Sequence, residues 1–557
     1  MKDGSISLTW RGLLALTFGF AALAACTRVA SDGTSGGGTG ASGGNAFTRP
    51  HELRVAQLSD VTGLNPMIST EATVHWMDQL TMAWLVRYDR SNTVIPELAT
   101  IVPTKANGGI SADGKTITYH LRKGVKWSDG TPFSADDVIF STKLIEDPKT
   151  NVQGREGWDQ IVKMDEPDKW TVVYHLKAPF SVFVGQTFAS GASQPAIVPK
   201  HLLAHSANVN TDPYNSLPVG IGPFKFVKWA RADRVELVAD PLYWRGRPKL
   251  DRIVFKIVPS RDTILSELQT GELDLWPIAA PAYLARIQGL KGFRLLRQPS
   301  YAFGHIDFNV SHPIVADASV RRALLLAWDR RAQRTKISHG VGVLQDSIIS
   351  PKNPMFDPKI GFTEKNVAKA NALLDRAGWK RGSDGIRAKN GVRLNLELVS
   401  NTGSPDTDSR IELLRQDWKA VGASLIRKNY DANLLFAPAQ QGGIIQTGKF
   451  DVVFFAWFLN ATNDNSNIYA CKQVPPAGQN DLRWCNPRAD AAMADFLTTF
   501  DVGRQKRDQF VLQEELARDT PTMVSSINED LFVENSDLEG FHPNGVSFFD
   551  DFMHVDI

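Results

Sequence analysis

The sequence has no block of like charge and almost no net charge. Its 557 residues include 62 lysines and arginines against 60 aspartates and glutamates, which leaves a formal charge of +2. Because binding to nucleic acid depends on clustered basic residues that neutralise phosphates, we expect no nucleic-acid partner. The apolar content of 43% and charged content of 22% are those of an ordinary globular protein, long enough for two or three domains.

Long apolar runs are scarce. Residues 12–23 form an apolar run of about a dozen residues, whereas a helix that crosses a bilayer needs roughly 20. Lys2 and Arg11 precede this run and small residues end it, which is the pattern of an export signal. No later segment has a run of about 18 apolar residues, so we expect no membrane-spanning helix in the mature chain.

Cys26 directly follows Leu23, Ala24 and Ala25, and this arrangement resembles the lipobox of bacterial lipoproteins. The resemblance implies cleavage before Cys26 and acylation of its thiol, so we predict a signal peptide at residues 1–25. Residues 26–46 are rich in Gly, Ser and Thr and are predicted to form a flexible tether. A plain signal peptide with an incidental cysteine is the alternative.

Cysteine is rare, with three residues in the whole sequence. With Cys26 assigned to the anchor, Cys471 and Cys485 remain, and in an oxidising compartment they could close a loop of about 15 residues. We predict that they form a disulfide, with two unpaired buried thiols as the alternative. The sequence has no CxxC motif and no histidine beside these cysteines, so we predict no metal site and no cofactor.

Motifs of catalysis are missing too. There is no HExxH helix for zinc, and the GxSxG pattern occurs only within the Gly/Ser-rich tract, at 33–37 and 40–44, where no strand-to-helix elbow for a nucleophilic serine is expected. Residues 109–116 match the phosphate-loop pattern GxxxxGK[ST], but a strand pattern follows where that loop requires a helix. We therefore predict that the protein is not an enzyme and that this stretch is a hairpin turn. A catalytic triad dispersed along the chain is the alternative that the local sequence leaves open.

Helix and strand patterns alternate along the chain, which is typical of α/β proteins. Residues 74–86 have apolar side chains at helical spacing, and residues 116–121 alternate as a strand. Ser134 is predicted to cap a helix that runs through Leu144. The nearly all-apolar run 451–457 predicts a strand buried on both faces, at the centre of a sheet. Further strands are predicted at 53–56, 252–258 and 394–398, and further helices at 263–268, 320–328, 365–377 and 412–421.

Several segments together resemble one family. They are LNP at 64–66, DGKT at 113–116, LRKGVKWSDGTPF at 121–133, PVGIGPF at 218–224 and LLDRAGW at 373–379. In this order the sequence resembles the extracytoplasmic solute-binding proteins of family 5, the peptide and nickel class of ABC importers. Taken by themselves, these residues have structural explanations. Gly124 supplies a turn, Trp127 and Phe133 are expected in the core, and Gly220 and Gly222 stand where backbone segments approach closely.

The resemblance implies an α/β fold of the two-lobed periplasmic-binding-protein kind, type II, enlarged by an extra subdomain and with a hinge between the lobes. The chain would cross between the lobes near Phe308 and again near Ser525. The expected boundaries are 47–100, 191–307 and 527–557 for lobe I, 101–190 for its inserted subdomain and 308–526 for lobe II.

The same resemblance implies capture of a solute between the lobes and its delivery to ABC permease and ATPase subunits. We expect a monomer that binds an oligopeptide or dipeptide and is anchored by lipid to a bacterial membrane, in the periplasm or at the cell surface. Two alternatives stay open. One is the same fold with a non-peptide solute such as an oligosaccharide, and the other is a sensory or scaffold lipoprotein without transport.

Peptide binders of this family often hold the peptide amino group with an acidic residue in a pattern like GWxxDxxDP. In the matching stretch here, Asn460 and Asn463 stand at the two aspartate positions and Asp464 stands where proline is expected. A neutral amide cannot form the charge-assisted pair. Either Asp464 takes that role, or the solute has no free amine at this place.

We predict that six residues contact the solute, four around this motif and two from lobe I. They are Trp457, Asn460, Asn463 and Asp464, together with Ser69 and Thr70, which follow the LNP segment. Core packing is the alternative for Trp457, and a turn-rich surface loop is the alternative for residues 460–467.

Overall fold

The computed structural model describes residues 45–557 except 70, 153, 191–194 and 403–404. The predicted signal peptide, Cys26 and nearly all of the predicted tether lie outside the described residues, as does Thr70. Within the described part of the chain, no helix is long and apolar enough to cross a membrane.

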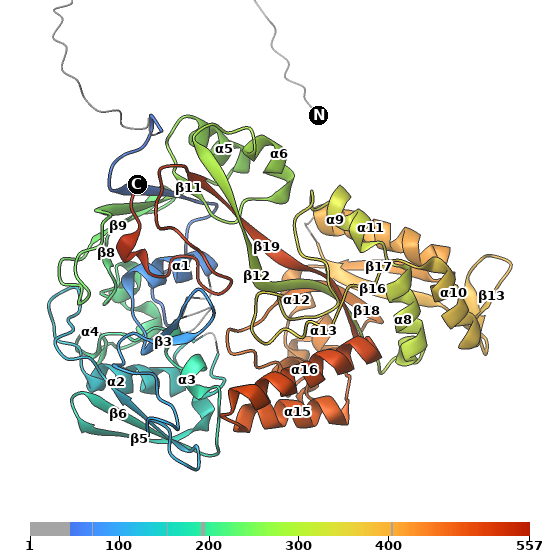
Figure 1. The fold of residues 1–557 in the computed structure, drawn as a ribbon, viewed down its shortest axis with the longest axis horizontal. Helices are drawn as coiled ribbons and strands as arrows, with labels where there is room; N and C mark the ends of the chain where they lie inside the picture. Colours follow the sequence, from blue (N-terminus) through green and yellow to red (C-terminus); the bar gives the residue numbers. More distant parts are fainter. Residues whose placement is uncertain (1–44, 70, 153, 191–194, 403–404) are drawn as a thin grey trace, which may run out of the picture. The chain divides into compact units, whose positions relative to one another are not determined.

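A sheet of ten strands connects the two halves of the folded chain (Figure 1). The sheet is mixed, with parallel pairs such as β1 with β10 and antiparallel pairs such as β12 with β18. Its order is β17 (Ser424–Tyr430), β16 (Asn395–Asn401), β18 (Val452–Phe458), β12 (Phe293–Phe308), β19 (Thr522–Asn535), β11 (Leu275–Trp276), β1 (Glu52–Gln57), β10 (Arg252–Ile257), β9 (Arg234–Ala239) and β8 (Phe224–Ala230).

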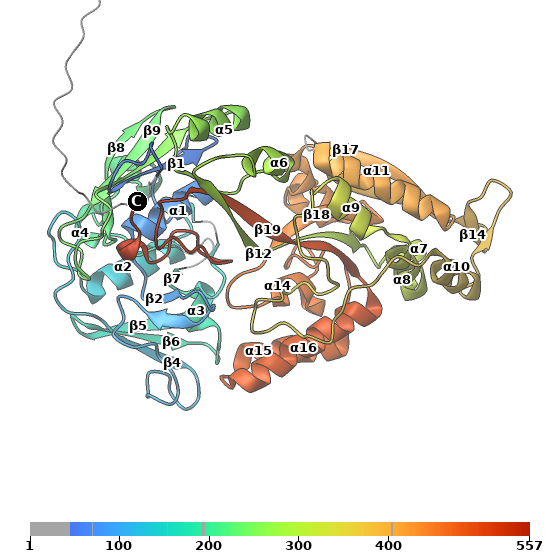
Figure 2. The same cartoon turned by 45° about the horizontal axis from the view of Figure 1, so that its top comes forward.

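Two long strands, β12 and β19, lie at the middle of this sheet. They pair antiparallel from Phe293 opposite Asn535 to Asp307 opposite Thr522, with register shifts between Pro299 and Phe303 and between Gly304 and His305. Figures 1 and 2 show this pair running from the elements that include α1 and β8 to those that include α8 and β16. The two halves therefore share one continuous pair of strands.

The half that contains β16–β18 has helices packed on both faces of its strands. On one face Ile306 and Phe308 pack with Trp328 and Trp418, and on the other Phe303 packs with Leu512. Asp317 caps α8 by accepting the backbone N–H of Ser319 (2.8 Å), which confirms the predicted helix there. The helices are α8 (Ala318–Ala327), α9 (Arg330–Lys336), α10 (Val367–Arg376), α11 (Pro405–Ala420), α15 (Pro487–Thr498) and α16 (Val502–Asp519).

The other half has a core built from both ends of the chain. Leu53 and Val55 of β1 are fully buried and share a hydrophobic cluster with Phe541, Phe549 and Phe552. This cluster also contains residues of α1 (Ala72–Thr81). The helix α5 (Arg261–Gln269) follows β10 in the chain, and its buried side chains belong to a separate cluster with Trp276. The backbone N–H of His51 donates to the carbonyl of Ile557 (3.1 Å), so the start of the body and the C-terminus are neighbours.

A segment near residues 101–190 supplies most of another hydrophobic cluster, to which Leu85, Ile197 and other side chains outside this range also belong. It combines the sheet β4 (Thr116–His120), β6 (Thr171–Leu176) and β5 (Ile161–Asp168) with α2 (Ala135–Glu146). Trp127 and Phe133 are fully buried there, as predicted. The Asp137 carboxylate accepts the backbone N–H of Ser134 (3.0 Å) in a capping box at the start of α2. The phosphate-loop pattern is a turn that leads into β4, which confirms the hairpin interpretation.

Two predictions about backbone geometry have different outcomes. A Cβ atom on Gly220 would lie 1.9 Å from the carbonyl oxygen of Thr81, so the close backbone approach is confirmed. The helix predicted over 74–86 ends at Thr81, and this prediction is wrong for its last turn. The backbone there pairs with distant segments instead, because Leu85 N–H donates to the carbonyl of Phe188 (2.9 Å).

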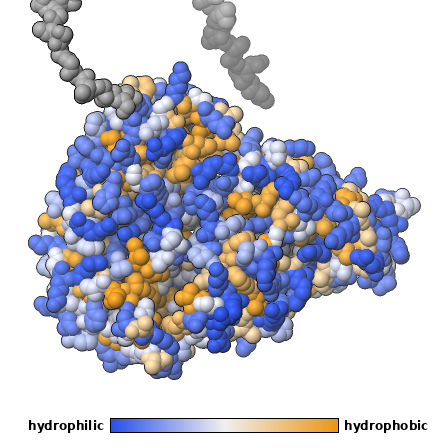
Figure 3. All heavy atoms as spheres, in the orientation of Figure 1, coloured by the Kyte–Doolittle hydropathy of each residue, from blue (hydrophilic) through white to orange (hydrophobic). Residues whose placement is uncertain are grey.

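Cys471 and Cys485 are joined by a disulfide, as predicted. On the surface, hydrophilic residues cover most of the face in Figure 3, interrupted by several small apolar groups. Among the large apolar side chains, Phe458 is the most exposed at 77%.

Candidate functional site

The strand β18 is buried over its first half only. Val452 to Phe455 are buried, but Ala456 and Phe458 are exposed and Trp457 is half-buried. The prediction of a strand buried on both faces is therefore wrong for Ala456 and Trp457, the last two residues of the predicted run 451–457. The strand pairing explains this, because β16 pairs with β18 only at Val452 and Val453, whereas β12 pairs with all seven residues.

Trp457 packs against aromatic side chains of its own strand and of the neighbouring strand β12. Its ring lies parallel to that of His305 with 6.3 Å between centroids, and edge-on to Phe455 at 5.1 Å. The indole N–H is buried without a hydrogen-bond partner in the described part of the chain. The ring of Trp457 therefore packs as a core residue does, and its indole N–H is a hydrogen-bond donor without an acceptor among the described residues.

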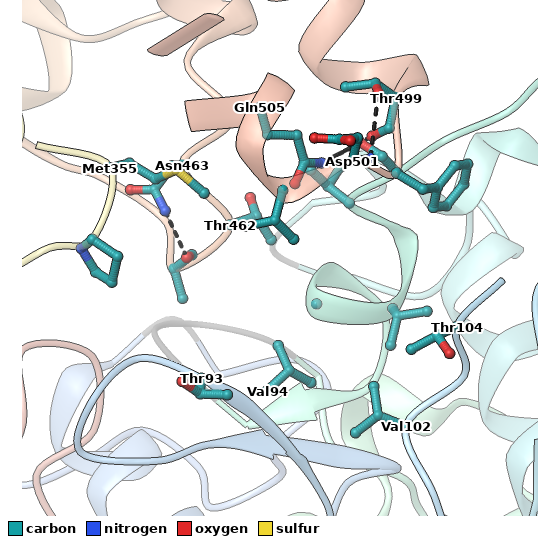
Figure 4. A pocket seen from close by; sticks show the side chains of 18 of the residues that line it. Thr93, Val94, Val102, Thr104, Met355, Thr462, Asn463, Thr499, Asp501 and Gln505 are labelled. Atoms are coloured by element: carbon teal, nitrogen blue, oxygen red, sulfur yellow. Dashed lines mark hydrogen bonds between the residues drawn. The ribbon is translucent and has the colours of Figure 1, made fainter. Parts of the chain in front are cut away.

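A cavity of about 870 Å³ lies beside the loop that follows β18 (Figure 4). One wall is formed by residues between Tyr88 and Ile110 and by residues 181–185, and the opposite wall by residues 353–355, 461–463 and 496–505. The volume is that of a ligand pocket for a small organic molecule. The lining combines apolar side chains with threonine hydroxyls and amides, and it includes two charged residues, Lys105 and Asp501.

Hydrogen bonds join the two walls. Ser181 donates from its Oγ to the carbonyl of Phe496 (2.7 Å) and from its backbone N–H to that of Leu497 (2.8 Å), and Gln505 Nε2 donates back to Ser181 Oγ (3.1 Å). Asn92 Nδ2 donates to the carbonyl of Ala461 (3.3 Å). The cavity is therefore bounded by direct contacts between two parts of the chain.

Asn463 lines this cavity, and the structure also shows what else it does. It has a left-handed backbone conformation (φ 61°), and its Oδ1 accepts a hydrogen bond from Asn353 Nδ2 (2.5 Å). Gln509 Nε2 donates to its carbonyl oxygen (2.8 Å), and Asn465 Nδ2 donates to the same oxygen (3.1 Å). All four of these amide side chains are buried. They hold the loop after β18 against α16.

Of the other predicted site residues, those that the structure describes line neither this cavity nor the second one described below. Asn460 Oδ1 accepts the hydroxyl of Thr462 (2.7 Å), and the Asp464 carboxylate accepts the backbone N–H of Ser466 (2.9 Å). Burial raises the pKa of Asp464. Ser69 Oγ accepts the backbone N–H of Glu71 (3.3 Å). Contact of these residues and of Thr70 with a solute stays a prediction.

A second cavity, of about 370 Å³, lies at the carboxyl ends of the parallel strands β16 and β18. In α/β sheets this is the edge where ligands bind most often. The sequence analysis missed it, although the helix-after-strand pattern at 394–421 could have indicated it. Its lining includes Asn401, Arg410, Phe436, Ala456, Ser525 and Asn528.

No group of three or more His, Cys, Asp or Glu residues in the described ranges is arranged to hold a metal ion. The cavities also carry no histidine in their linings. Among the described residues, the side chains at these walls offer hydrogen-bond donors and acceptors to a ligand.

The long paired strands, the two halves that they join and the cavity between chain segments define a two-lobed solute-binding protein. Solved structures show the same fold. Oligopeptide-binding AppA from Bacillus subtilis, in complex with a nonapeptide, has a TM-score of 0.72 at 22% identity, covering 90% of this chain and 98% of its own. NikA from Brucella suis, in complex with Fe(III)-EDTA, has a TM-score of 0.77 at 20% identity, covering 90% and 99%.

Residues 93–478 match the family described as bacterial extracellular solute-binding proteins, family 5 middle, and the chain belongs to this family. It is 25% identical to the oligopeptide-binding protein AppA of Bacillus subtilis (strain 168) over 505 residues, 88% of this chain and 89% of that one. It is 28% identical to the dipeptide-binding protein of Escherichia coli (strain K12), over 76% of this chain and 79% of that one. The protein is accordingly an extracytoplasmic binding protein and not an enzyme.

Proposed function

We propose that the protein captures an oligopeptide or dipeptide between its two lobes and delivers it to an ABC permease, with Cys26 acylated as its membrane anchor. The observation that carries the proposal is the cavity of about 870 Å³ in a family whose curated relatives include oligopeptide- and dipeptide-binding proteins. The absence of histidine from its lining favours a peptide over a metal complex held by the protein's own ligands.

The lobe boundaries belong to the same proposal. Lobe I comprises 47–100, 191–307 and 527–557, with the subdomain 101–190, and lobe II comprises 308–526. Ligand held by both lobes stabilises the closed form through contacts that the open form lacks. The bonds from Ser181 to residues 496 and 497 would be among those broken on opening, since they join the subdomain to lobe II.

Native mass spectrometry of the purified mature protein, followed by a thermal-shift screen with di- to nonapeptides and oligosaccharides, tests the ligand class. A bound ligand raises the apparent stability by mass action. We expect peptides to raise the melting temperature. A rise with an oligosaccharide and none with any peptide would contradict the proposal.

The transport role needs a separate measurement. Radiolabelled peptide uptake by cells should fall when the gene is deleted, and return with the wild-type gene but only in part with Cys26→Ala, which removes the anchor. Unchanged uptake in the deletion strain would assign the protein to a sensory or scaffold role instead.

A further inference from the structure

The turn between α15 and α16 meets the subdomain 101–190. In Figures 1 and 2 one end of this helix pair lies beside the elements of that subdomain. Phe500, in the turn between Thr498 and Val502, packs against the hydrophobic cluster to which residues 101–190 contribute most. Of the described side chains in or against this cluster, only Ala461 and Phe500 come from residues 308–526. Phe500 is therefore a residue of lobe II that packs in the core of the subdomain.

The ring of Phe500 occupies a place that a side chain at Gly114 would need. A Cβ atom on Gly114 would lie 2.7 Å from Cε2 of Phe500 and 3.2 Å from Cβ of Pro179. Lys105 Nζ lies 4.7 Å from the centroid of the same ring and donates to the carbonyl of Ala112 (2.9 Å). The fit of the ring therefore depends on the missing side chain at Gly114.

The turn that receives the ring is held by bonds of its own. Gly114 has a left-handed backbone (φ 73°), and its N–H donates to the carbonyl of Ser111 (2.9 Å). The Asp113 carboxylate accepts the hydroxyl of Ser111 (2.6 Å) and the backbone N–H of Lys115 (3.1 Å). Because all of these bonds lie within residues 111–115, the turn needs no contact with lobe II to form. The pattern at 109–116 that matches a phosphate loop thus supplies a docking place for a ring.

The turn that presents the ring is also fixed locally. Asp501 Oδ1 caps α16 by accepting the backbone N–H of Arg504 (2.7 Å), and Asp501 N–H donates to Thr499 Oγ1 (3.3 Å). Gln505 Nε2 donates to the carbonyl of Thr499 (3.0 Å). Figure 4 shows Thr499, Asp501 and Gln505 together on one wall of the larger cavity. Both partners of the contact are thus preorganised, and neither needs a solute.

We propose that the packing of Phe500 against the turn at 111–115, here termed the latch, holds the two walls of the larger cavity together before any solute binds. The inference rests on the proposed function and deepens it, because it names the contact that sets how readily the lobes open. A protein whose binding-competent form is already populated loses less affinity to the conformational change. Loss of the latch should therefore weaken every solute by the same factor.

Small-angle X-ray scattering of the purified, unliganded mature protein tests the latch without a solute. Phe500→Ala should raise the radius of gyration. Gly114→Asn should do the same from the other side, because asparagine tolerates the left-handed backbone but its side chain takes the place of the ring. The matched control is Gly124→Asn, since Gly124 has the same backbone conformation (φ 79°) and nothing within 4 Å of its Cβ position. The proposal is overturned if both variants scatter as the wild type does, or if Gly124→Asn opens the protein equally.

The double variant separates loss of the latch from two unrelated defects. Phe500→Ala and Gly114→Asn remove the same contact, so the combined variant should be no more open than either single variant. Circular dichroism should show that each variant keeps the helix and strand content of the wild type. A further increase in the radius of gyration in the double variant would contradict the latch.

Phe500 and Lys105 also line the larger cavity, so the solute measurement must distinguish the latch from a direct contact. For each of several peptides, Phe500→Ala should raise the dissociation constant by one common factor of roughly 5- to 30-fold, mainly through faster dissociation. A factor that changes with the peptide sequence would make Phe500 a solute contact and overturn the latch.

The two proposals fail separately. If no peptide binds but the radius of gyration rises in Phe500→Ala and Gly114→Asn, the peptide proposal fails and the latch stands. If peptides bind and the variants scatter as the wild type does, the latch fails and the proposed function stands.

Discussion

Asp78 on α1 gives the most direct test of how burial sets stability in this protein. Its side chain is 1% exposed, and neither carboxylate oxygen has a hydrogen-bond partner among the described residues. His75 Nδ1 lies 3.6 Å away and Tyr214 packs nearby. Burial raises the pKa of Asp78 from 3.8 to about 6, although His75 partly opposes it.

The sign and size of the effect follow from proton linkage. The unfolded chain loses this proton near pH 4, whereas the folded protein keeps it until about pH 6. Stability therefore falls as the pH rises through this window and stays lowered above it. A shift of about 2 units corresponds to about 3 kcal/mol. In Asp78→Asn this loss is absent, so the variant should gain about 3 kcal/mol relative to wild type between pH 4 and pH 7.5.

Urea unfolding at pH 4, 5, 6 and 7.5, followed by tryptophan fluorescence and circular dichroism, measures this difference. The matched control is Asp136→Asn, which removes an exposed carboxylate on α2 that pairs with Lys200. Its pH profile should run parallel to that of the wild type within about 1 kcal/mol. The reasoning is refuted if Asp78→Asn also runs parallel, or if its relative stability falls as the pH rises.

Three further outcomes are expected. Gly220→Ala should destabilise lobe I by more than about 3 kcal/mol or prevent soluble expression, because its Cβ would lie 1.9 Å from a backbone oxygen. The control Gly361→Ala has open space around the new Cβ and should be nearly neutral. The double variant Cys471→Ser, Cys485→Ser should lose about 3 kcal/mol in urea unfolding and no longer respond to reductant, and an unshifted midpoint would contradict this. Ser181→Ala removes hydrogen bonds between the cavity walls. Solute affinity should therefore fall roughly 3- to 10-fold, and the radius of gyration of the unliganded protein should rise. An unchanged affinity would count against closure through these contacts.

Local patterns predicted much of the fold, because capping and periodicity depend on near neighbours. The pairing of Ser134 with Asp137 and the cap at Asp317 are examples. Errors arose where the backbone forms hydrogen bonds with segments that are distant in the sequence. The helix over 74–86 was predicted one turn too long because Leu85 bonds to Phe188, about a hundred residues away.

The site was harder to predict for the same reason. Asn463 could be found from the motif after β18, and it lines the larger cavity. Arg410 could not, since Asp406, Asp408 and Glu412 surround it in the sequence and suggest a solvated, paired helix face. Only the folded chain shows that its neighbours pair elsewhere, Asp408 with Arg427 and Glu412 with Arg415.

The meeting of His51 with Ile557 has a consequence for the order of assembly. The core around Leu53 and Val55 needs Phe541, Phe549 and Phe552, so it cannot close until the final residues of the chain are present. The half that contains β16–β18 and α8–α16 is drawn from one later stretch and can condense earlier. The strand β1 can therefore be buried only after the C-terminal segment of the chain has been made.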